Sequence, residues 1–204
     1  MQLQNYYYWF KDAIPHHVCD DIVRYAKSIQ DEMAVTGGLG NRKLNKKEVQ
    51  DLKKKRDSDI VWLNERWIYN AIHPYIHQAN RDANWNFEWD FSESCQFTKY
   101  KKGQYYDWHC DSWDKPYDSP NTPSHGKQRK LSVTLSLSDD KDYSGGELEF
   151  DMRNLDPDKK ANTHVLKEIR SKGSLVVFPS DVWHRVKPVK RGVRHSLVIW
   201  NLGW

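Results

Sequence analysis

Residues 131–138 alternate strictly between apolar and polar side chains, and this pattern leaves few folds open to the chain. Leu or Val fills every second position, and Ser or Thr fills the positions between them. Such alternation predicts a β-strand with one apolar and one polar face. Shorter runs of the same kind follow Glu93 and are separated by turns such as residues 142–146. We therefore expect an antiparallel jelly roll, an architecture whose interior can enclose a ligand.

The earlier part of the chain has a helical pattern instead. Apolar side chains recur at helical spacing over residues 14–29, with Pro15 in the first turn. A second helical pattern covers residues 60–79. Pro74 interrupts it, which predicts a kink or a split at that point. We expect these helices to pack their apolar faces on a sheet.

The length of the chain favours one domain. Its 204 residues contain no long Gly/Ser-rich or Pro-rich linker, and a chain of this size can bury a sizeable core. We predict a single domain over residues 1–204, mainly β with supporting α. Helical support over residues 1–90 would buttress a jelly-roll core, or double-stranded β-helix, over residues 91–204.

Composition gives a first indication of the environment of the protein. Residues 1–10 lack the charged start and the apolar stretch of a signal peptide, and no run approaches the roughly 18 apolar residues that span a bilayer. We therefore expect a cytoplasmic protein with no membrane partner. The three Cys residues show no zinc-like spacing, so a disulfide framework is not expected. The net charge of +4 is mild and by itself says little about partners.

A candidate metal site comes from His109 and Asp111. Side chains two residues apart on a strand point to the same face, with Cα atoms about 6 to 7 Å apart, so both can reach one metal ion. His184 supplies a second imidazole later in the chain. Two His and one carboxylate leave other metal positions open, the ligand set of non-heme Fe(II) oxygenases.

A His-x-Asp triplet alone carries little weight, because chance gives about one in a chain of this composition. The order of the surrounding parts is more informative. An aromatic strand with a glycine precedes the triplet, a Gly-Gly turn and an apolar strand follow it, and then come the second His and an Arg-x-Ser pair. These parts are Tyr100-x-x-Gly103-x-x-Tyr106-x-x-His109-x-Asp111, Gly145-Gly146-x-Leu148, the strand from Gly173 to Pro179, His184, and Arg194-x-Ser196.

Over residues 94–204 this order resembles the Fe(II)- and 2-oxoglutarate-dependent dioxygenases, and within them the prolyl 4-hydroxylase-like branch. The resemblance implies Fe(II) and 2-oxoglutarate as cofactors, O2 as a co-substrate, and ascorbate as a further cofactor. It implies that the catalytic residues are the metal ligands His109, Asp111 and His184. It also implies that the distal carboxylate of 2-oxoglutarate is held by Arg194, Ser196 and Tyr100.

Strand alternation supports the same role for Arg194. If residues 193–201 form a strand, Arg194 and Ser196 share a mostly apolar face with Val198 and Trp200. A buried charge is costly unless an anion is supplied to it. A guanidinium with a hydroxyl two residues along matches a carboxylate such as that of 2-oxoglutarate. The neighbouring His195 faces the other way, and we leave it out of the site.

The resemblance implies a prolyl 4-hydroxylase that acts on a Pro-containing peptide or protein and couples O2 and 2-oxoglutarate decarboxylation to C–H hydroxylation. Three alternatives remain open: an oxygenase that repairs nucleic acid, an oxygenase of small metabolites, and a metal-binding jelly roll without catalysis. Repair enzymes usually carry a second Arg six residues after the first. Trp200 occupies that position here, which disfavours a nucleic-acid partner.

Two polar segments are expected to be surface loops near the site. Residues 36–58 contain three glycines and a basic run, and they could form a lid over an acidic or extended substrate. Residues 112–128 directly follow the proposed ligands, where a long loop is often functional. Trp108, Trp113 and Trp183 adjoin the proposed ligands in sequence and could wall the site.

Overall fold

The structure is a computed structural model, and it describes residues 5–29, 32–33, 46–112, 114–153 and 160–204. The helices in those residues are α1 (His16–Ser28), α2 (Lys46–Lys55) and α3 (Arg66–Asp82). The strands there are β1 (Tyr8–Phe10), β2 (Glu32–Met33), β3 (Arg56–Asp57), β4 (Asp59–Leu63), β5 (Phe91–Ser92), β6 (Cys95–Tyr100), β7 (Tyr105–His109), β8 (Gln128–Ser136), β9 (Tyr143–Gly145), β10 (Leu148–Asp151), β11 (Thr163–Val165), β12 (Leu175–Pro179), β13 (His184–Val186), β14 (Val189–Gly192) and β15 (Arg194–Gly203).

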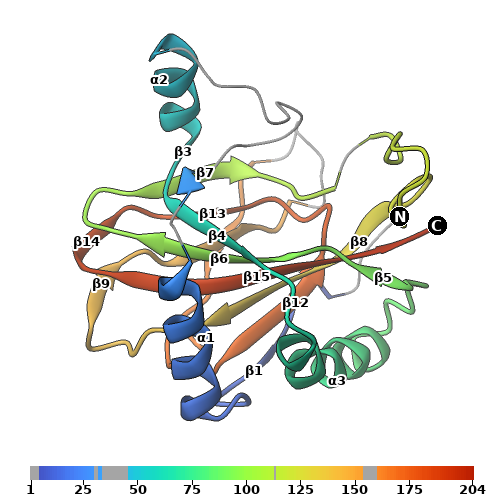
Figure 1. Cartoon of the computed structure of the whole chain (residues 1–204), viewed down its shortest axis with the longest axis horizontal. Coiled ribbons are helices and arrows are strands. Elements are labelled where there is room, and N and C mark those ends of the chain that lie inside the picture. The colour runs from blue at the N-terminus through green and yellow to red at the C-terminus, as the bar shows by residue number, and fades with distance from the viewer. Residues whose placement is uncertain (1–4, 30–31, 34–45, 113, 154–159) are drawn as a thin grey trace.

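Two antiparallel sheets form the body of the protein (Figure 1). The larger has the order β1-β12-β8-β15-β6-β4-β2, with β5 also paired to β15. The smaller has the order β11-β10-β13-β7-β3, and β14 and β9 form a separate ribbon. Apolar side chains of both sheets, among them Val176 and Phe178 from β12 and Leu148 and Phe150 from β10, meet in one buried cluster. The sheets therefore face each other as a double-stranded β-helix, which confirms the predicted jelly roll.

The alternating segment becomes β8, in the middle of the large sheet. Leu131, Val133 and Leu135 belong to the core that includes the apolar faces of α1 and α3. Ser132 lies on the other face of β8, between the two sheets, and is fully buried. The polar face of the predicted strand therefore points into the jelly roll rather than to solvent.

The helices differ from the prediction in two respects. Residues 59–63 form strand β4, so the second helical pattern starts only at Arg66. A run of β-branched and aromatic residues in this segment favours a strand over a helix. Pro74 lies inside α3, and the helix continues to Asp82 without a split at this residue.

The boundary near residue 90 does not separate helices from sheets. Strands β1, β2 and β4, all before residue 90, extend the large sheet, and β3 extends the small one. Strand β1 pairs with β12, which lies more than 160 residues later in the chain. Sequence-local patterns cannot reveal such long-range pairing.

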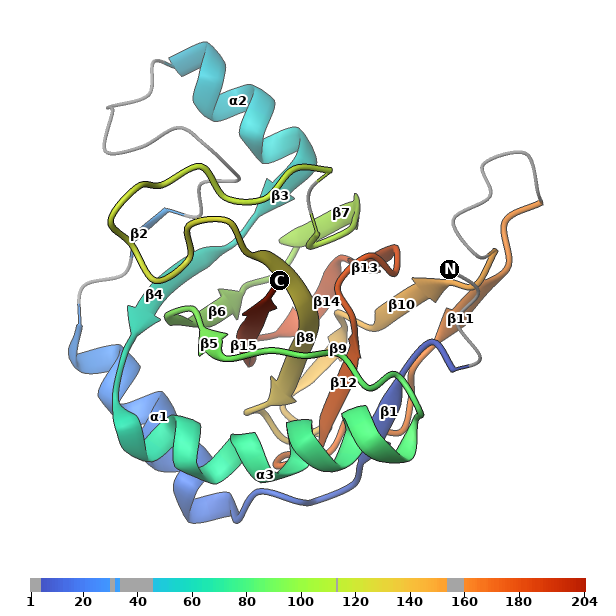
Figure 2. The ribbon, with the colours of Figure 1, turned by 90° about the vertical axis from the view of Figure 1, so that its right-hand side faces the viewer.

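The basic segment predicted as a loop over residues 36–58 contains helix α2 and strand β3. Residues 34–45 lie outside the described residues. In Figures 1 and 2, α2 lies apart from α1 and α3, beyond β3 and β7. The other predicted loop has neither helix nor strand in its described part until β8 begins at Gln128.

Two further predictions concern the cysteines and membrane insertion. Cys19, Cys95 and Cys110 form no disulfide, as expected. None of the helices in the described part of the chain combines the length and the apolar character that crossing a membrane requires.

Candidate active site

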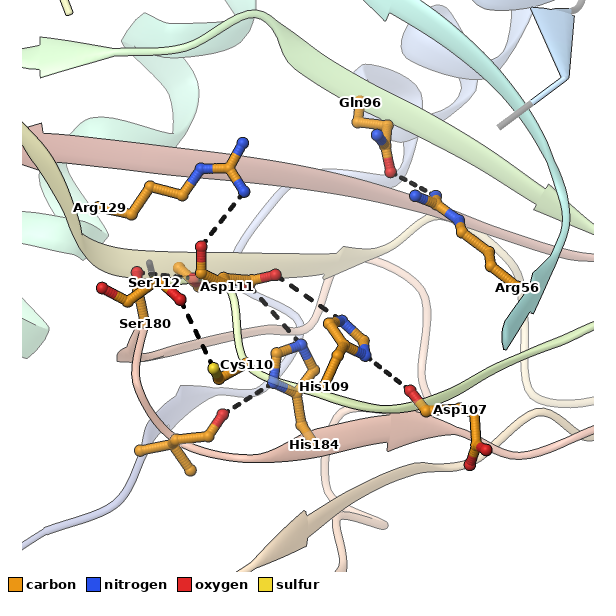
Figure 3. Close-up of polar contacts among 12 residues, drawn as sticks. Arg56, Gln96, Asp107, His109, Cys110, Asp111, Ser112, Arg129, Ser180 and His184 are labelled. Atoms are coloured by element: carbon orange, nitrogen blue, oxygen red, sulfur yellow. Dashed lines mark hydrogen bonds and ion pairs between the residues drawn. The ribbon is translucent and has the colours of Figure 1, made fainter. Parts of the chain in front are cut away.

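His109, Asp111 and His184 come together between the two sheets. His109 ends β7 and His184 begins β13, and these two residues are direct partners across the antiparallel pair. Figure 3 shows the three side chains pointing toward one another. One potential ligand atom from each lies within 4.8 Å of the others, and all three residues are buried. No other group of this kind occurs among the described residues.

Asp111 reaches the site by a different route from the one predicted. It lies beyond the end of β7 rather than on that strand. Its backbone N–H donates to the carbonyl oxygen of Ser180 at 2.8 Å, and the N–H of Ser112 donates to the same oxygen at 2.9 Å. The segment before β13 therefore fixes where the carboxylate points.

The hydrogen bonds of the two imidazoles define their tautomers. His109 Nδ1 lies 2.7 Å from the carbonyl oxygen of Asp107, and His184 Nδ1 lies 2.9 Å from that of Val182. A carbonyl oxygen only accepts, so each Nδ1 carries a proton, and in the neutral imidazole the lone pair is then on Nε2. Such contacts from the second ring nitrogen are usual for metal-ligating histidines.

The free nitrogens face the carboxylate of Asp111 at distances that suit a shared ion. His109 Nε2 lies 3.7 Å from Oδ1 and His184 Nε2 lies 3.6 Å from Oδ2. Both separations are longer than an ordinary hydrogen bond. A metal ion about 2.1 Å from each ligand atom fits between atoms spaced in this way.

The protein also sets the charges of these groups. Burial, with a further effect of His184, lowers the pKa of His109 from 6.5 to about 3. Burial raises the pKa of Asp111, but His184, His109, Arg129 and a hydrogen bond from Ser132 outweigh it and hold this pKa below 3.8. At neutral pH, His109 is therefore neutral and Asp111 is ionised, the forms in which they bind metal.

Ser132 fixes one oxygen of the Asp111 carboxylate. Its hydroxyl donates to Asp111 Oδ2 at 2.7 Å and lies 2.9 Å from the hydroxyl of Ser180. Ser132 is one of the polar residues of the alternating strand. An inward-facing hydroxyl of β8 thus orients a potential metal ligand.

A pocket between the two sheets is lined by His109, Asp111 and His184. Arg194 lines this pocket as well and is 3% exposed. Its Nη1 donates to the hydroxyl of Ser196 at 3.0 Å, and its guanidinium lies 5.5 Å from the ring centroid of Tyr100 on the neighbouring strand β6. Among the described residues, no carboxylate lies within ion-pair distance of Arg194. The structure thus brings Arg194, Ser196 and Tyr100 together and leaves the charge of Arg194 uncompensated.

The structure confirms that alternate residues of β15 share one face, as the sequence predicted. Arg194, Ser196, Val198 and Trp200 all line this pocket. His195 points away from it and stacks on Phe97.

The predicted tryptophan walls are not found. Trp183 is 44% exposed, and Trp108 lies against the guanidinium of Arg185; neither lines the pocket. Trp113 lies outside the described residues. The aromatic walls are instead Tyr106, which stacks on His109 with ring centroids 3.5 Å apart, and Trp200.

Two arginines near the site, Arg56 (buried) and Arg129 (partly buried), had no distinguishing signal in the sequence. Arg56 lines the pocket, lies 4.6 Å from the ring centroid of Tyr106, and donates to Ser58 and Gln96. Arg129 pairs with Glu93 through both carboxylate oxygens, at 3.0 and 2.5 Å. The Arg129 guanidinium also lies 3.9 Å from the ring centroid of Trp200.

Two His and one carboxylate inside a jelly roll define a donor set of the non-heme Fe(II) oxygenase type. Comparison with known proteins agrees. The family model described as the 2OG-Fe(II) oxygenase superfamily matches residues 95–201, which is more than half of the chain. The chain therefore belongs to the 2OG-Fe(II) oxygenase superfamily.

Individual relatives resemble parts of the chain or its fold. A PKHD-type hydroxylase of Synechococcus sp. (strain CC9902) is 38% identical over 99 residues, which cover 48% of this chain and 36% of that protein. This chain thus spans well under half the length of the curated relatives it matches.

Solved structures share the fold at low sequence identity. A Pseudomonas putida prolyl-4-hydroxylase superposes with a TM-score of 0.67 and 20% identity, covering 97% of this chain and 93% of that one. A prolyl hydroxylase from Trichoplax adhaerens, solved with a peptide fragment of the hypoxia inducible factor oxygen degradation domain, has a TM-score of 0.60 and 15% identity, covering 97% and 84%.

Proposed function

We propose that this protein is an Fe(II)- and 2-oxoglutarate-dependent dioxygenase that hydroxylates a prolyl residue in a peptide or protein, as a prolyl 4-hydroxylase. One observation carries the oxygenase part. Two imidazole nitrogens with free lone pairs and an ionised carboxylate converge in a pocket that also contains a buried guanidinium without a carboxylate partner. The first three groups fit a cation and the fourth fits an anion.

In this proposal each residue has a distinct role. His109, Asp111 and His184 hold the iron, and Arg194 binds the distal carboxylate of 2-oxoglutarate, with Ser196 and Tyr100 beside it. When bound, iron and 2-oxoglutarate supply the oxidative chemistry, in which O2 reduction and decarboxylation are coupled to hydroxylation of a C–H bond.

The rest of the chain's contribution is positioning and exclusion of water. The carbonyl oxygens of Asp107 and Val182 hold the two imidazoles in one tautomer, and Ser132 holds the carboxylate. Tyr106 covers one face of the His109 ring, and burial raises the pKa of its phenol to about 12, so the hydroxyl stays protonated. These contacts are already formed without substrate, which lowers the cost of ordering the site.

Trp200 supports a peptide as the substrate. It lines the pocket, and its indole N–H is buried with no hydrogen-bond partner among the described residues. An unpaired buried donor is rare in a folded protein. A backbone carbonyl of a bound peptide would satisfy it, and Trp200 would give a prolyl ring an aromatic surface in the pocket. The prolyl hydroxylase structures with the same fold agree with this choice.

The test is an aerobic assay with Fe(II) and 2-oxoglutarate across Pro-containing peptides, free proline and methylated oligonucleotides. We expect succinate formation and one added oxygen on a prolyl residue. Asp111→Asn should abolish both, while Asp114→Asn, which changes an exposed carboxylate three residues further along the chain, should retain them. Ascorbate should sustain repeated turnover.

Other outcomes would point to the alternatives. Oxygen on a methylated base or on free proline only would remove the prolyl peptide and keep the oxygenase. No succinate with any substrate, together with no binding of 2-oxoglutarate, would favour a metal-binding protein without catalysis. The cytoplasmic location stays a prediction from the sequence.

A further inference from the structure

We propose that the exposed lysines at the end of α2 bind an acidic segment of the substrate, roughly four residues from the residue that is oxidised. The proposal rests on the proposed function, because it concerns how a peptide is recognised at the same site. It assigns a role to the basic segment that the catalytic groups leave unexplained.

The end of α2 is fastened to the wall of the active site. The hydroxyl of Tyr105 on β7 contacts the carbonyl oxygens of Lys53 and Lys54, at 3.1 and 2.7 Å. Strand β3 follows α2 directly and pairs with β7, with Arg56 opposite Tyr106. Arg56 itself lines the pocket. The helix end is thus held by the strand that carries His109.

The charges at this helix end are mostly uncompensated. Lys53, Lys54 and Lys55 are consecutive and exposed. Lys54 pairs with Asp51 at 2.8 Å, but their side chains are 77% and 53% exposed, so this pair contributes little. No carboxylate of the described residues lies within ion-pair distance of Lys53 or Lys55. The dipole of a helix favours cations near its C-terminus. One lysine would satisfy this preference, so the dipole does not explain three.

Strand β7 gives an approximate scale for the separation of the α2 end from the metal ligands, because Tyr105 contacts the helix end and His109 is one of the ligands. Tyr105 begins and His109 ends the five-residue strand β7. At about 3.3 Å per residue, the two ends lie about 13 Å apart. An extended peptide covers that distance in about four residues. Acidic side chains at this spacing from the target residue would reach the lysines while the target lies at the site.

A polypeptide fits this surface better than a nucleic acid. The pocket beside it has the unpaired donor of Trp200, which suits a backbone carbonyl. The exposed aromatic rings that single-stranded nucleic acid requires for stacking do not accompany the lysines in the described part of α2.

Fluorescence anisotropy can test the proposal on protein loaded with Mn(II), an inert substitute for Fe(II), and 2-oxoglutarate. Three labelled peptides would share a central proline and carry Glu, Gln or Lys at positions four residues away on both sides. We expect the Glu peptide to bind about fivefold to tenfold more tightly than the Gln peptide at low salt, and the difference to shrink at high salt.

Variants of the lysines locate the effect. Replacing all three with Gln (Lys53→Gln, Lys54→Gln and Lys55→Gln together) should remove the preference for Glu while leaving binding of the Gln peptide unchanged. Replacing them with Arg should retain it. A control with three exposed lysines elsewhere replaced, at Lys27, Lys141 and Lys167, should behave as the parent protein.

The outcomes separate this proposal from the proposed function. Equal binding of the Glu and Gln peptides, or an equal loss in the control variant, would overturn it even if prolyl peptides are hydroxylated. A labelled single-stranded oligonucleotide that binds in a lysine-dependent way, with no preference among peptides, would overturn it in favour of nucleic acid. A lysine-dependent preference for Glu without hydroxylation of any prolyl peptide would support acidic recognition and refute only the prolyl reaction.

Discussion

Arg129 lies over the ring of Trp200, which lines the candidate site, and Arg194 lines the same site, but the partners of the two arginines differ. Arg129 forms a two-fold contact with the carboxylate of Glu93, and the side chains are 13% and 18% exposed. Arg194 is 3% exposed, and its polar partner in the described part of the chain is the neutral hydroxyl of Ser196.

This difference in counter-charge indicates that Arg129 stabilises the fold and that Arg194 is available to bind a ligand. A buried charge is stabilised only when its partner is close and well oriented. Glu93 provides that partner for Arg129 within the protein, so this guanidinium can hold Trp200 in place at all times. Arg194 lacks one, so an anion that enters the pocket gains the full interaction.

The largest expected effect is on binding of 2-oxoglutarate. Arg194→Ala should weaken it about 100-fold, because losing a buried contact to a carboxylate costs about 2 to 5 kcal/mol. The free energy of unfolding should stay the same or rise, since an uncompensated buried charge is removed. Calorimetry on the Mn(II)-loaded protein measures the affinity. Arg191→Ala, an exposed residue of β14, is the control; an equal loss there would indicate a diffuse basic patch.

The opposite pattern is expected at the other arginine. Glu93→Gln should lower the free energy of unfolding by about 3 kcal/mol, because it leaves the largely buried Arg129 without its counter-charge. Urea denaturation measures this change. Asp21→Asn breaks an exposed pair with Arg24 and should cost under about 1 kcal/mol. If Glu93→Gln were as mild as Asp21→Asn, the assignment of Arg129 to a structural role would be wrong.

The sequence could predict Arg194 but not Arg129 for a physical reason. Strand alternation is local, so it places Arg194 with Ser196 on an apolar face from sequence alone. The partner of Arg129 lies 36 residues away on another segment. Nothing in the spacing of Glu93 and Arg129 indicates that they meet.

The same limit explains the other differences. The triplet spacing brought His109 and Asp111 together correctly, although Asp111 is positioned by Ser180 rather than by a continuing strand. Helix α2 was not predicted, because a lysine-rich segment with few apolar residues has the composition of a solvated loop. In β4 the spacing of Ile60 and Leu63 is compatible with a helix. The segment forms a strand instead, because it pairs with β6, a contact that the local spacing does not reveal.

A smaller effect is expected when the orientation of a metal ligand is changed. Ser132→Ala removes the hydrogen bond to Asp111 Oδ2 and should weaken Mn(II) binding about tenfold, in the range known for residues that orient metal ligands. Metal titration monitored by competition with a chelator measures it. Ser136→Ala is the matched control on the same strand, because its hydroxyl contacts the backbone carbonyls of Ser138 and Arg170 instead. Equal affinities for the two variants would remove the role given to Ser132.

The smallest expected effect concerns how the loop before β8 supports the structural arginine. Tyr117 donates from its hydroxyl to Glu93 Oε1 at 2.8 Å, so it contacts the carboxylate that neutralises Arg129. Tyr117→Phe should lower the free energy of unfolding by about 1 kcal/mol, the usual net value of one hydrogen bond. In a Glu93→Ala background the same substitution should cost less, because this acceptor is gone, and urea denaturation of the four proteins measures the coupling. Binding of 2-oxoglutarate at Arg194 should be unchanged throughout. Additive losses would mean that Tyr117 stabilises the loop independently of Glu93, and a loss of 2-oxoglutarate binding would mean that the two arginines are not separate in function.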